Sequence, residues 1–428
     1  MSFISLPGSD NYRLVNCSLA GIFTTDTPSD KTISVDIEIA GGRIAAIKPA
    51  LGEPDTLPGV DCRGGMIWPA FIDFHTHIDK AHIWERAPNL SGDFRGAVEA
   101  MDRERERPSS RNDILRRGEF ALTSAYVHGT KAIRTHVDAR TSVAETSWSS
   151  LAQLREEWRG RIELQLVSAG PSDLLLGETG RKTADLVERH GGLLGCVLRS
   201  MPDLDERVEA IFRLAKERDL SLDFHVDEND DPTSNALVVI AQAAIRFGYE
   251  GRVNCGHCCS LALFDEAERA KTVRTVAEAG LSIVSLPMCN LYLQDREAGR
   301  TPRWRGVTLL HELNDAGVPV SLGSDNVRDP FYAYGDLDML EVFREGVRIG
   351  HLDRPCTEWP ASVTLTPAKL MGIEGGAIAA GNPADFVIFR GRRYSEILSR
   401  HQSDRLVVRN GRQVTTALPD FECLDDLM

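Results

Sequence analysis

Residues 66–80 read MIWPAFIDFHTHIDK, an apolar run that ends in two histidines. Seven further apolar runs follow along the chain, and several of them also end in polar residues. They are KAIRTHVD (131–138), ELQLVSA (163–169), LLGCVLRS (193–200), SLDFHVDE (221–228), GRVNCGH (251–257), LSIVSLP (281–287) and VPVSLGSDN (318–326). Nearly continuous apolar runs of this length are typical of parallel strands buried on both faces.

Helical patterns lie between these runs. Apolar residues recur at spacings of three and four in ILRRGEFALTSAYVHG (114–129), ERVEAIFRLAKERD (206–219), NALVVIAQAAIRFG (235–248) and DEAERAKTVRTVAEAG (265–280). Such spacing places the apolar side chains on one face of a helix. Strand followed by helix, eight times over, predicts the α/β class and a (β/α)8 TIM barrel.

The two ends of the chain have a different texture. Short alternating segments separated by turn residues occur at 12–19, 32–40 and 42–48, and again at 376–391 and 405–414. They predict antiparallel strands, and we expect both ends to meet in a small β-sandwich domain. The expected division is 1–65 and 375–428 for the two parts of the β-sandwich and 66–374 for the barrel.

Charge and composition exclude several classes of protein. The net charge of −14 argues against nucleic-acid binding, which needs a basic surface. No segment reaches 18 uninterrupted apolar residues and the N-terminus lacks a secretory signal, so we expect no membrane partner. Nine scattered cysteines predict reduced, mostly buried thiols and a cytoplasmic location. Barrels of this kind often pack into oligomers through their outer helices, so a homo-oligomer is an open alternative to a monomer.

Histidines and an aspartate fall at the ends of four predicted barrel strands, where the catalytic groups of such barrels gather. These candidate ligands for one metal ion are His75, His77, His225, His257 and Asp325. Imidazoles and a carboxylate around a divalent ion can lower the pKa of water towards neutrality. Asp325 could also accept the proton of that water, in which case His257 would orient the hydroxide or stabilise the tetrahedral intermediate.

Glu228 lies three residues after His225, in the turn that leaves the fifth strand. A carboxylate at this position can reach both the activated water and the substrate, as a proton shuttle must. The alternative is an acidic residue at the N-terminus of a helix, where it would interact with the helix dipole.

The chain resembles the amidohydrolase superfamily, and most specifically its cytosine deaminase-like branch, over about residues 12–415. The similar segments are PAFIDFHTHIDK, RTHVDA, LQLVSA, DFHVDEND, NLYLQDR, RGVTLL, GSDNVRDPFYAYGDLDML and GNPADFVIF, the last like the pattern GxxADxVxx. The resemblance implies that one Fe or Zn ion is held by the residues matching His75, His77, His225 and Asp325. It further implies that the residue matching Glu228 shuttles protons and that the one matching His257 assists the activated water.

Substrate contacts differ from that branch. Cytosine deaminases carry a glutamine after the third strand, where this chain has Pro171, which offers no side-chain hydrogen bond. HTHIDK also resembles the N-isopropylammelide isopropylaminohydrolases, so Lys80 either contacts substrate or pairs with an acid such as Asp79 or Glu85. The other candidates for substrate binding are Gln294, unless it faces solvent, Asn326, and Arg199, unless it pairs with Asp203.

The predicted activity is hydrolytic deamination of an amino-substituted nitrogen heterocycle, a small molecule, with one divalent metal ion (Zn or Fe). Cytosine is the family's model substrate, and pterin, isoguanine or an aminotriazine that loses an alkylamine are the alternatives. Hydrolysis of a cyclic amide is a second enzymatic reading. It is disfavoured because LLGCVLRS lacks the lysine that bridges two metals in dihydroorotase-like relatives. A catalytically dead barrel scaffold is the non-enzyme alternative, disfavoured because all the expected ligands are present.

Overall fold

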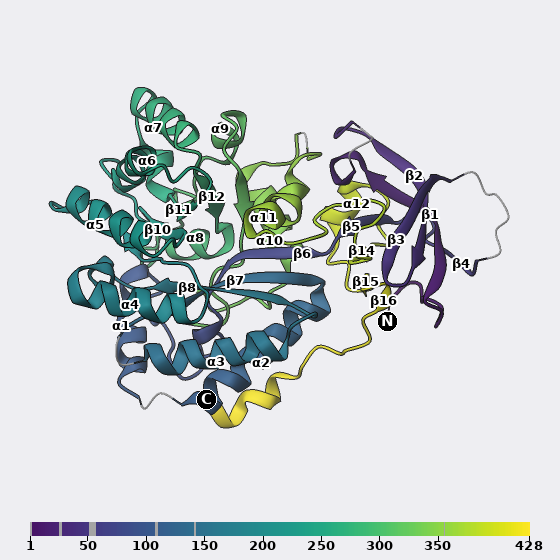
Figure 1. The fold of residues 1–428 in the computed structure, drawn as a ribbon, viewed down its shortest axis with the longest axis horizontal. Coiled ribbons are helices and arrows are strands. Elements are labelled where there is room, and N and C mark those ends of the chain that lie inside the picture. Colours follow the sequence, from purple (N-terminus) through teal and green to yellow (C-terminus); the bar gives the residue numbers. More distant parts are fainter. Residues whose placement is uncertain (1, 25–27, 51–56, 108–109, 141–142, 355) are drawn as a thin grey trace. The chain divides into compact units, whose positions relative to one another are not determined.

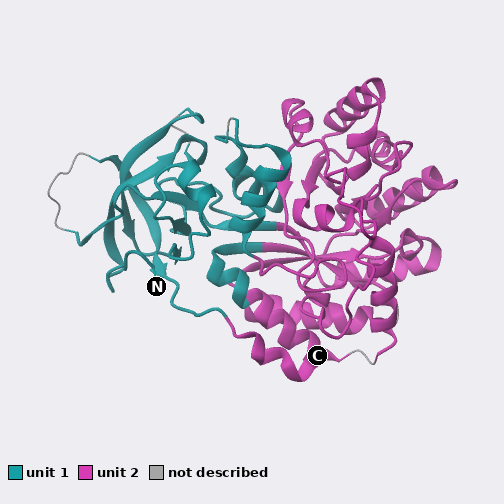
Figure 2. Ribbon diagram, turned by 180° about the vertical axis from the view of Figure 1, so that it is seen from behind, with its two compact units in different colours: residues 1–73, 123–132, 338–418 teal, residues 74–122, 133–337, 419–428 magenta. Residues whose placement is uncertain are grey.

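The computed structural model describes residues 2–24, 28–50, 57–107, 110–140, 143–354 and 356–428 (Figure 1). The chain forms two compact units, and it passes between them several times (Figure 2). The first unit comprises residues 1–73, 123–132 and 338–418, and the second comprises 74–122, 133–337 and 419–428.

Eight strands form the predicted barrel. They are β6 (Phe71–Thr76), β7 (Thr130–Asp138), β8 (Glu163–Ala169), β9 (Val197–Leu198), β10 (Leu222–Val226), β11 (Val253–His257), β12 (Ser282–Ser285) and β13 (Val320–Leu322). One sheet has the order β6-β7-β8 and the other β13-β12-β11-β10-β9. Parallel bridges join the two sheets at both edges, from Val167 to Leu193 and from Thr76 to Asp325. These bridges close the strands into a ring and confirm the TIM-barrel type of fold.

Helices alternate with the barrel strands. They are α1 (Phe94–Arg105), α2 (Arg111–His128), α3 (Ala144–Glu157), α4 (Gly177–Arg189), α5 (Leu204–Glu217), α6 (Ala236–Phe247), α7 (Glu266–Glu278), α8 (Pro287–Leu293), α9 (Leu310–Asp315), α10 (Met339–Gly350), α11 (Leu365–Met371) and α12 (Tyr394–Ser399). Of these, α2, α5, α6 and α7 coincide with the four predicted amphipathic patterns. Local sequence sets several of their ends. Asp265 caps α7 by accepting the backbone N–H of Glu268, and Gly248 ends α6 with a left-handed φ of 67°. Across the described ranges, no helix combines the length and apolar character that a membrane span requires.

The first apolar run contains two strands instead of one. Its initial part, β5 (Met66–Pro69), pairs with β1 (Asn11–Ala20) and β14 (Phe386–Ile388), whereas β6 begins at Phe71 and enters the barrel. Pro69 lies at the break, where its missing N–H removes a donor that a continuing strand would need. The expectation of one continuous barrel strand from Met66 was therefore wrong.

Strands from both ends of the chain share one eight-stranded sheet. Besides β1, β5 and β14 it contains β2 (Thr32–Ala40), β3 (Arg43–Pro49), β4 (Gly59–Asp61), β15 (Leu406–Arg409) and β16 (Arg412–Gln413). The pairs β1–β2, β2–β3, β5–β14 and β14–β15 are antiparallel. The pairing of the two chain ends is therefore observed, while their arrangement as a two-layered β-sandwich stays a prediction.

The last residues of the chain belong to the barrel unit, where the 3-10 helix η6 (Phe421–Leu427) packs against α2. The ring of Phe421 lies 5.3 Å from that of Phe120 and 6.3 Å from that of His82. Arg86 donates a hydrogen bond of 2.7 Å to the carbonyl of Leu427. The predicted division assigns this segment to the strand-rich end, because its sequence has no periodicity that indicates a helix returning to the barrel.

His82 makes the stability of this region depend on pH. Burial, with the nearby charges of Arg328 and Arg117, lowers its pKa from 6.5 to about 3. Unfolded chain therefore binds a proton that the fold does not, and the stability present above pH 6.5 is lost at roughly 1.4 kcal/mol per pH unit below it. We expect the unfolding free energy of a His82→Asn variant to fall less steeply between pH 6.5 and 5 than that of the wild type. Asparagine tolerates the φ of 57° at this position, and urea titrations at several pH values measure the slopes. Identical slopes would contradict this assignment.

All nine cysteines are free thiols, as the sequence predicted. Eight are buried and Cys423 is exposed. Cys255, Cys258 and Cys259 are buried and belong to none of the metal-ligating groups found among the described residues.

Candidate active site

The predicted ligands meet at one mouth of the barrel. Three groups of residues that could hold a metal ion occur among the described residues, and two of them are His75–His77–His225 and His75–His257–Asp325. In each group the ligand atoms lie within 4.8 Å of one another. The side chains come from β6, β10, β11 and the residues after β13, as expected for a TIM-barrel site.

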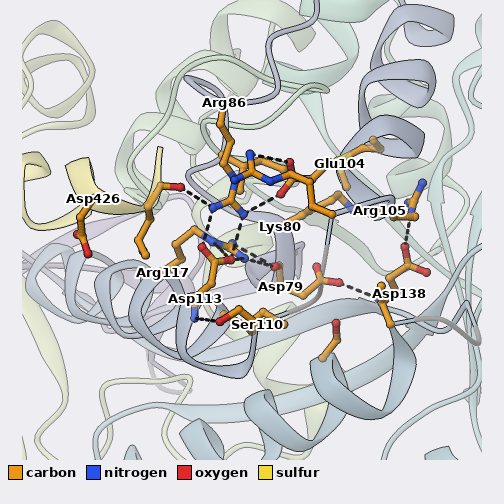
Figure 3. A pocket seen from close by; sticks show the side chains of 17 residues that line it. Asp79, Lys80, Arg86, Glu104, Arg105, Ser110, Asp113, Arg117, Asp138 and Asp426 are labelled. Carbon is orange, nitrogen blue, oxygen red and sulfur yellow. Dashed lines mark hydrogen bonds and ion pairs between the residues drawn. The ribbon is translucent and has the colours of Figure 1, made fainter.

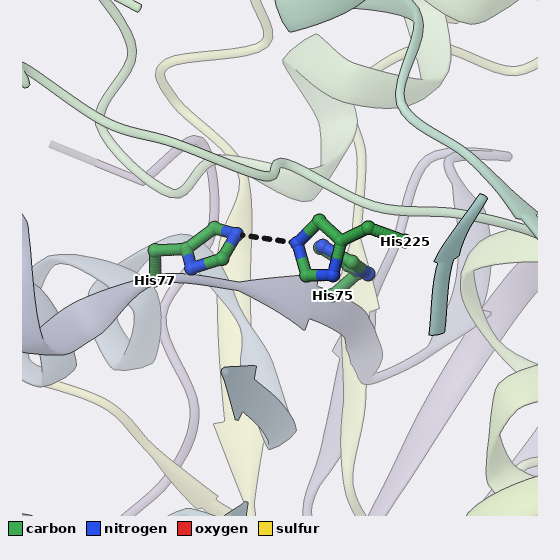
Figure 4. Close-up of side chains that lie close together, drawn as sticks. All are labelled: His75, His77 and His225. Atoms are coloured by element: carbon green, nitrogen blue, oxygen red, sulfur yellow. Dashed lines mark hydrogen bonds between the residues drawn. The ribbon is translucent and has the colours of Figure 1, made fainter. Parts of the chain in front are cut away.

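The distances describe a compact set of donors. The Nε2 atoms of His77 and His225 are 3.1 Å apart, and the dashed line in Figure 4 joins these two atoms. Oδ1 of Asp325 lies 3.3 Å from Nε2 of His77 and 3.6 Å from Nε2 of His75. None of these four side chains is more than 6% exposed.

These residues fit a metal ion. Both ring nitrogens of His75 are buried and have no hydrogen-bond partner among the described residues. Leaving such atoms unsatisfied in a protein interior is costly, and coordination of an ion would satisfy one of them. Nitrogen and carboxylate donors at this spacing are those that zinc and related divalent ions take.

The imidazoles are held in the form that binds metals. Burial, followed by the neighbouring His136, lowers the pKa of His75 and His225 well below the ordinary histidine value. Burial and the charge of Lys80 do the same for His77. Neutral rings carry the free lone pair that coordination requires.

Backbone geometry brings the donors together. Asp325 and His257 have left-handed φ values of 63° and 68°, which are uncommon outside glycine. Asp325 also donates its backbone N–H to the carbonyl of His75 at 2.8 Å. Gly256 and Gly323 allow the close approach, since a Cβ at either position would come within 3.1 Å of the His75 side chain. Spacing along the sequence could not reveal these two strained turns.

Glu228 lies beside this set. Its side chain is 10% exposed, and Oε1 lies 3.3 Å from Nδ1 of His257. Burial, and then the charge of Asp325, raises the pKa of Glu228 well above the ordinary value. Helix α6 begins only at Ala236, so Glu228 is not a first-turn residue. The helix-dipole interpretation is therefore wrong.

The His75 ring packs against a buried network of polar side chains. The sequence alone did not indicate a role for this network. The His136 ring lies 3.9 Å from the His75 ring, and its Nε2 is 3.3 Å from Oδ1 of Asp223. Arg134 and Asn254 donate to the same carboxylate at 2.9 and 2.8 Å. The third candidate metal group, His75–His136–Asp223, thus includes a carboxylate that already has a cationic partner. Charged residues inside the runs KAIRTHVD and SLDFHVDE were the available signal.

A cavity of about 300 Å³ opens onto the candidate ligands. Four of the five predicted substrate contacts line it, namely Lys80, Pro171, Arg199 and Asn326. Gln294 is not among the lining residues. Its side chain is 7% exposed and packs against Gly306, so it does not face solvent as the alternative had it. Phe94 and Phe331 also line the cavity and were not predicted.

The polar residues that line the cavity have other hydrogen-bond and ion-pair partners than those suggested by the sequence. Lys80 Nζ lies 2.7 Å from Nδ1 of His77, whereas Glu85 pairs with Arg328. Asp79 accepts the backbone N–H of Asp138. The carboxylate of Asp203 pairs with Arg207 at 2.8 Å.

Arg199 and Asn326 each present a polar side chain at the cavity wall. Arg199 is exposed there, and the acid suggested as its partner, Asp203, is engaged elsewhere. Asn326 donates from its amide to Oδ2 of Asp329 at 2.7 Å. The amide of Asn326 is therefore already oriented by a neighbouring carboxylate.

A second cavity of about 290 Å³ shares Lys80, Met101, Arg105 and Asp138 with the first (Figure 3). Its charged groups compensate one another. Arg86 pairs with Asp113 at 2.6 Å and with Glu104 at 2.8 Å, and Arg105 pairs with Asp138 at 2.6 Å. This polar network holds the η2 turn (Ile78–Lys80), which carries Lys80, against α1 and α2.

Comparison with known proteins gives consistent results. The model of the amidohydrolase family matches residues 93–415. A pterin deaminase of Rhizobium rhizogenes is 47% identical over 432 residues, covering 100% of this chain and 99% of that protein. The N-isopropylammelide isopropyl amidohydrolase of Pseudomonas sp. is 25% identical, covering 90% and 94%. The crystal structure of a 5-methylcytosine deaminase from Klebsiella pneumoniae has a TM-score of 0.81 at 23% identity, covers 95% and 98%, and shares the fold.

Proposed function

Because the chain belongs to the amidohydrolase family and is a metal-dependent hydrolytic deaminase of a nitrogen heterocycle, we propose that its substrate is a pterin. The observation that carries this proposal is the full-length identity of 47% to a pterin deaminase. The cavity is compatible with it. Pro171 lines the wall where cytosine deaminases present an amide, and Phe94 and Phe331 offer apolar surface to a flat two-ring heterocycle.

We propose that His75, His77, His225 and Asp325 hold one divalent ion, either Zn or Fe. Both ions accept imidazole and carboxylate ligands, so the donor set does not choose between them. When bound, such an ion lowers the pKa of water to near neutrality and so supplies a nucleophile at physiological pH.

The chain's own residues then move the protons. Glu228 holds a proton on its buried carboxyl and transfers it to the ring nitrogen next to the carbon that bears the amino group, which prevents charge from accumulating on the ring. Asp325 accepts the proton that the attacking water loses, and His257 orients the water or stabilises the tetrahedral intermediate. Water is consumed, the C–N bond breaks, and the products are the oxo heterocycle and ammonia.

The remaining side chains orient the heterocycle. Lys80 and Asn326 present polar groups next to the ligand set, while Arg199 lies exposed on the cavity wall. Pro171 contributes shape and no hydrogen bond. Gln294 does not line the cavity, so we assign it no substrate contact and only a buried position behind the wall.

The experiment that tests the function is ammonia release from a panel of pterin, isoguanine, cytosine and aminotriazines, with metal analysis of the same preparation. We expect bound metal and the highest kcat/KM for pterin. Release of an alkylamine from an N-alkyl aminotriazine in preference to ammonia from pterin would instead assign the second candidate, which the 25% identity to the N-isopropylammelide enzyme favours.

The finer architectural and cellular predictions belong to the same proposal. The eight-stranded sheet that unites both chain ends supports the predicted β-sandwich of 1–65 and 375–428 and barrel of 66–374, except that β5 joins the sheet and η6 belongs to the barrel unit. Nine free thiols support a reducing cytoplasm. Small heterocycles are the proposed partners, without nucleic acid or membrane, and the oligomeric state stays open.

A further inference from the structure

Asn290 lies at the barrel mouth on a short helix that starts directly after β12. Pro287 occupies the first turn of α8, and the backbone N–H of Asn290 bonds to the carbonyl of Leu286 at 3.0 Å. Proline suits this position because its missing N–H has no partner at a helix start. The side chain of Asn290 is completely buried, so its contacts are made within the protein.

The amide nitrogen of Asn290 meets two groups of the candidate active site at once. Nδ2 lies 3.1 Å from Oε1 of Glu228 and 3.0 Å from Nδ1 of His257, and these two atoms are 3.3 Å apart. An amide nitrogen carries two hydrogens, so it can donate one to each acceptor.

The contact with Nδ1 decides which nitrogen of His257 carries the hydrogen. A neutral ring that accepts at Nδ1 is protonated at Nε2. His257 accepts an amide hydrogen of Asn290 at Nδ1 in this geometry. Its Nε2 has no hydrogen-bond partner among the described residues and belongs to the group that includes His75 and Asp325. The ring therefore directs the N–H of Nε2 toward the site, where it serves as a hydrogen-bond donor.

The contact with Oε1 orients Glu228 in the same way. With Oε1 held by the amide, the carboxyl cannot rotate freely, and its second oxygen is left to serve the cavity that Glu228 lines. The free-energy cost of reaching the transition state is lower for a proton donor of fixed geometry than for a mobile one.

We propose that Asn290 is a positioning residue that fixes the tautomer of His257 and the orientation of the Glu228 carboxyl through one amide nitrogen. This inference rests on the proposed function, since it concerns how the same site performs deamination. It assigns a role to a residue that does not line the substrate cavity and acts through Glu228 and His257.

The test compares Asn290→Asp and Asn290→Ala in the metal-loaded enzyme. Aspartate keeps the shape and replaces the donor with an acceptor, whereas alanine removes both hydrogen bonds. We expect kcat for pterin to fall by about 10²-fold or more in both variants, with KM changed by less than about threefold and with wild-type metal content. Asn382→Ala is the control, because it removes an amide that bonds only to a carbonyl, that of Ala377, in the other unit.

A second measurement reads the tautomer directly and does not depend on turnover. Nitrogen-15 chemical shifts of labelled histidines in the zinc-loaded protein, with His257→Gln to assign the signals, should show the hydrogen of His257 on Nε2 in the wild type. In Asn290→Asp it should move to Nδ1. An unchanged tautomer in that variant, or kcat within threefold of the wild type, would overturn the inference. Wild-type protein that shows the expected tautomer but no ammonia release from pterin would count against the proposed substrate alone.

Discussion

Replacement of Glu228 by glutamine is expected to leave metal content unchanged and to lower kcat by about 10³-fold or more. The amide has the shape of the carboxyl but cannot deliver a proton to the heterocycle. Burial beside Asp325 raises the pKa of Glu228, which favours the protonated form that the proposed reaction needs. Ammonia release measured at saturating substrate, together with metal analysis, checks both parts of this expectation.

The matched control is Glu217→Gln, which makes the same chemical change on the exposed surface of α5. It should retain wild-type kcat and metal. Survival of turnover in Glu228→Gln would show that another group supplies the proton, and loss of its metal would show that Glu228 is a ligand.

Removal of the metal is the change with the second large expected effect. Chelation should abolish ammonia release, and Zn²⁺ or Fe²⁺ should restore it, because the proposed reaction depends on water that the ion activates at neutral pH. Asp325→Asn should weaken metal binding severely, since it removes the anionic donor that lies 3.3 Å from Nε2 of His77. The apoprotein should also melt at a lower temperature. An ion present at 100 times its Kd stabilises the fold by about 2.7 kcal/mol.

His351→Asn serves as the control for loss of a histidine, because His351 is an exposed residue at the C-terminal end of α10 with a φ of 55° that asparagine tolerates. It should keep both metal and activity. Full ammonia release by protein that contains no metal would remove the basis of the proposed mechanism.

Much of the barrel could be predicted because its signals are local. Helices α2, α5, α6 and α7 follow from apolar spacing, and the strands follow from apolar runs. Placing polar residues at strand ends was enough to bring His75, His225 and Asp325 together, since the topology of a barrel fixes where those ends lie. The break after Pro69 was the exception, because an apolar run does not reveal which of two sheets receives each half.

The contacts between side chains could not be predicted, because they depend on packing between segments far apart in the sequence. Asn290 carries no distinctive signal within NLYLQDR, and its two partners lie just after β10 and at the end of β11. The pairing of Lys80 with His77 instead of an acid reflects the curvature of the η2 turn. Left-handed φ values at His257 and Asp325 likewise arise from the closed barrel and not from a glycine or turn signal.

The bridge from Thr76 to Asp325 has a consequence for how the protein is made. It joins the first barrel strand to the last, and the proposed ligands lie on both sides of that seam. During synthesis His75 and His77 emerge long before Asp325. The complete set of proposed ligands is therefore assembled only once the ring has closed. An ion bound by ligands on both sides would then stabilise the closed ring, because opening the seam would break a metal–ligand bond. The rate of metal loss should then set the lifetime of the folded chain.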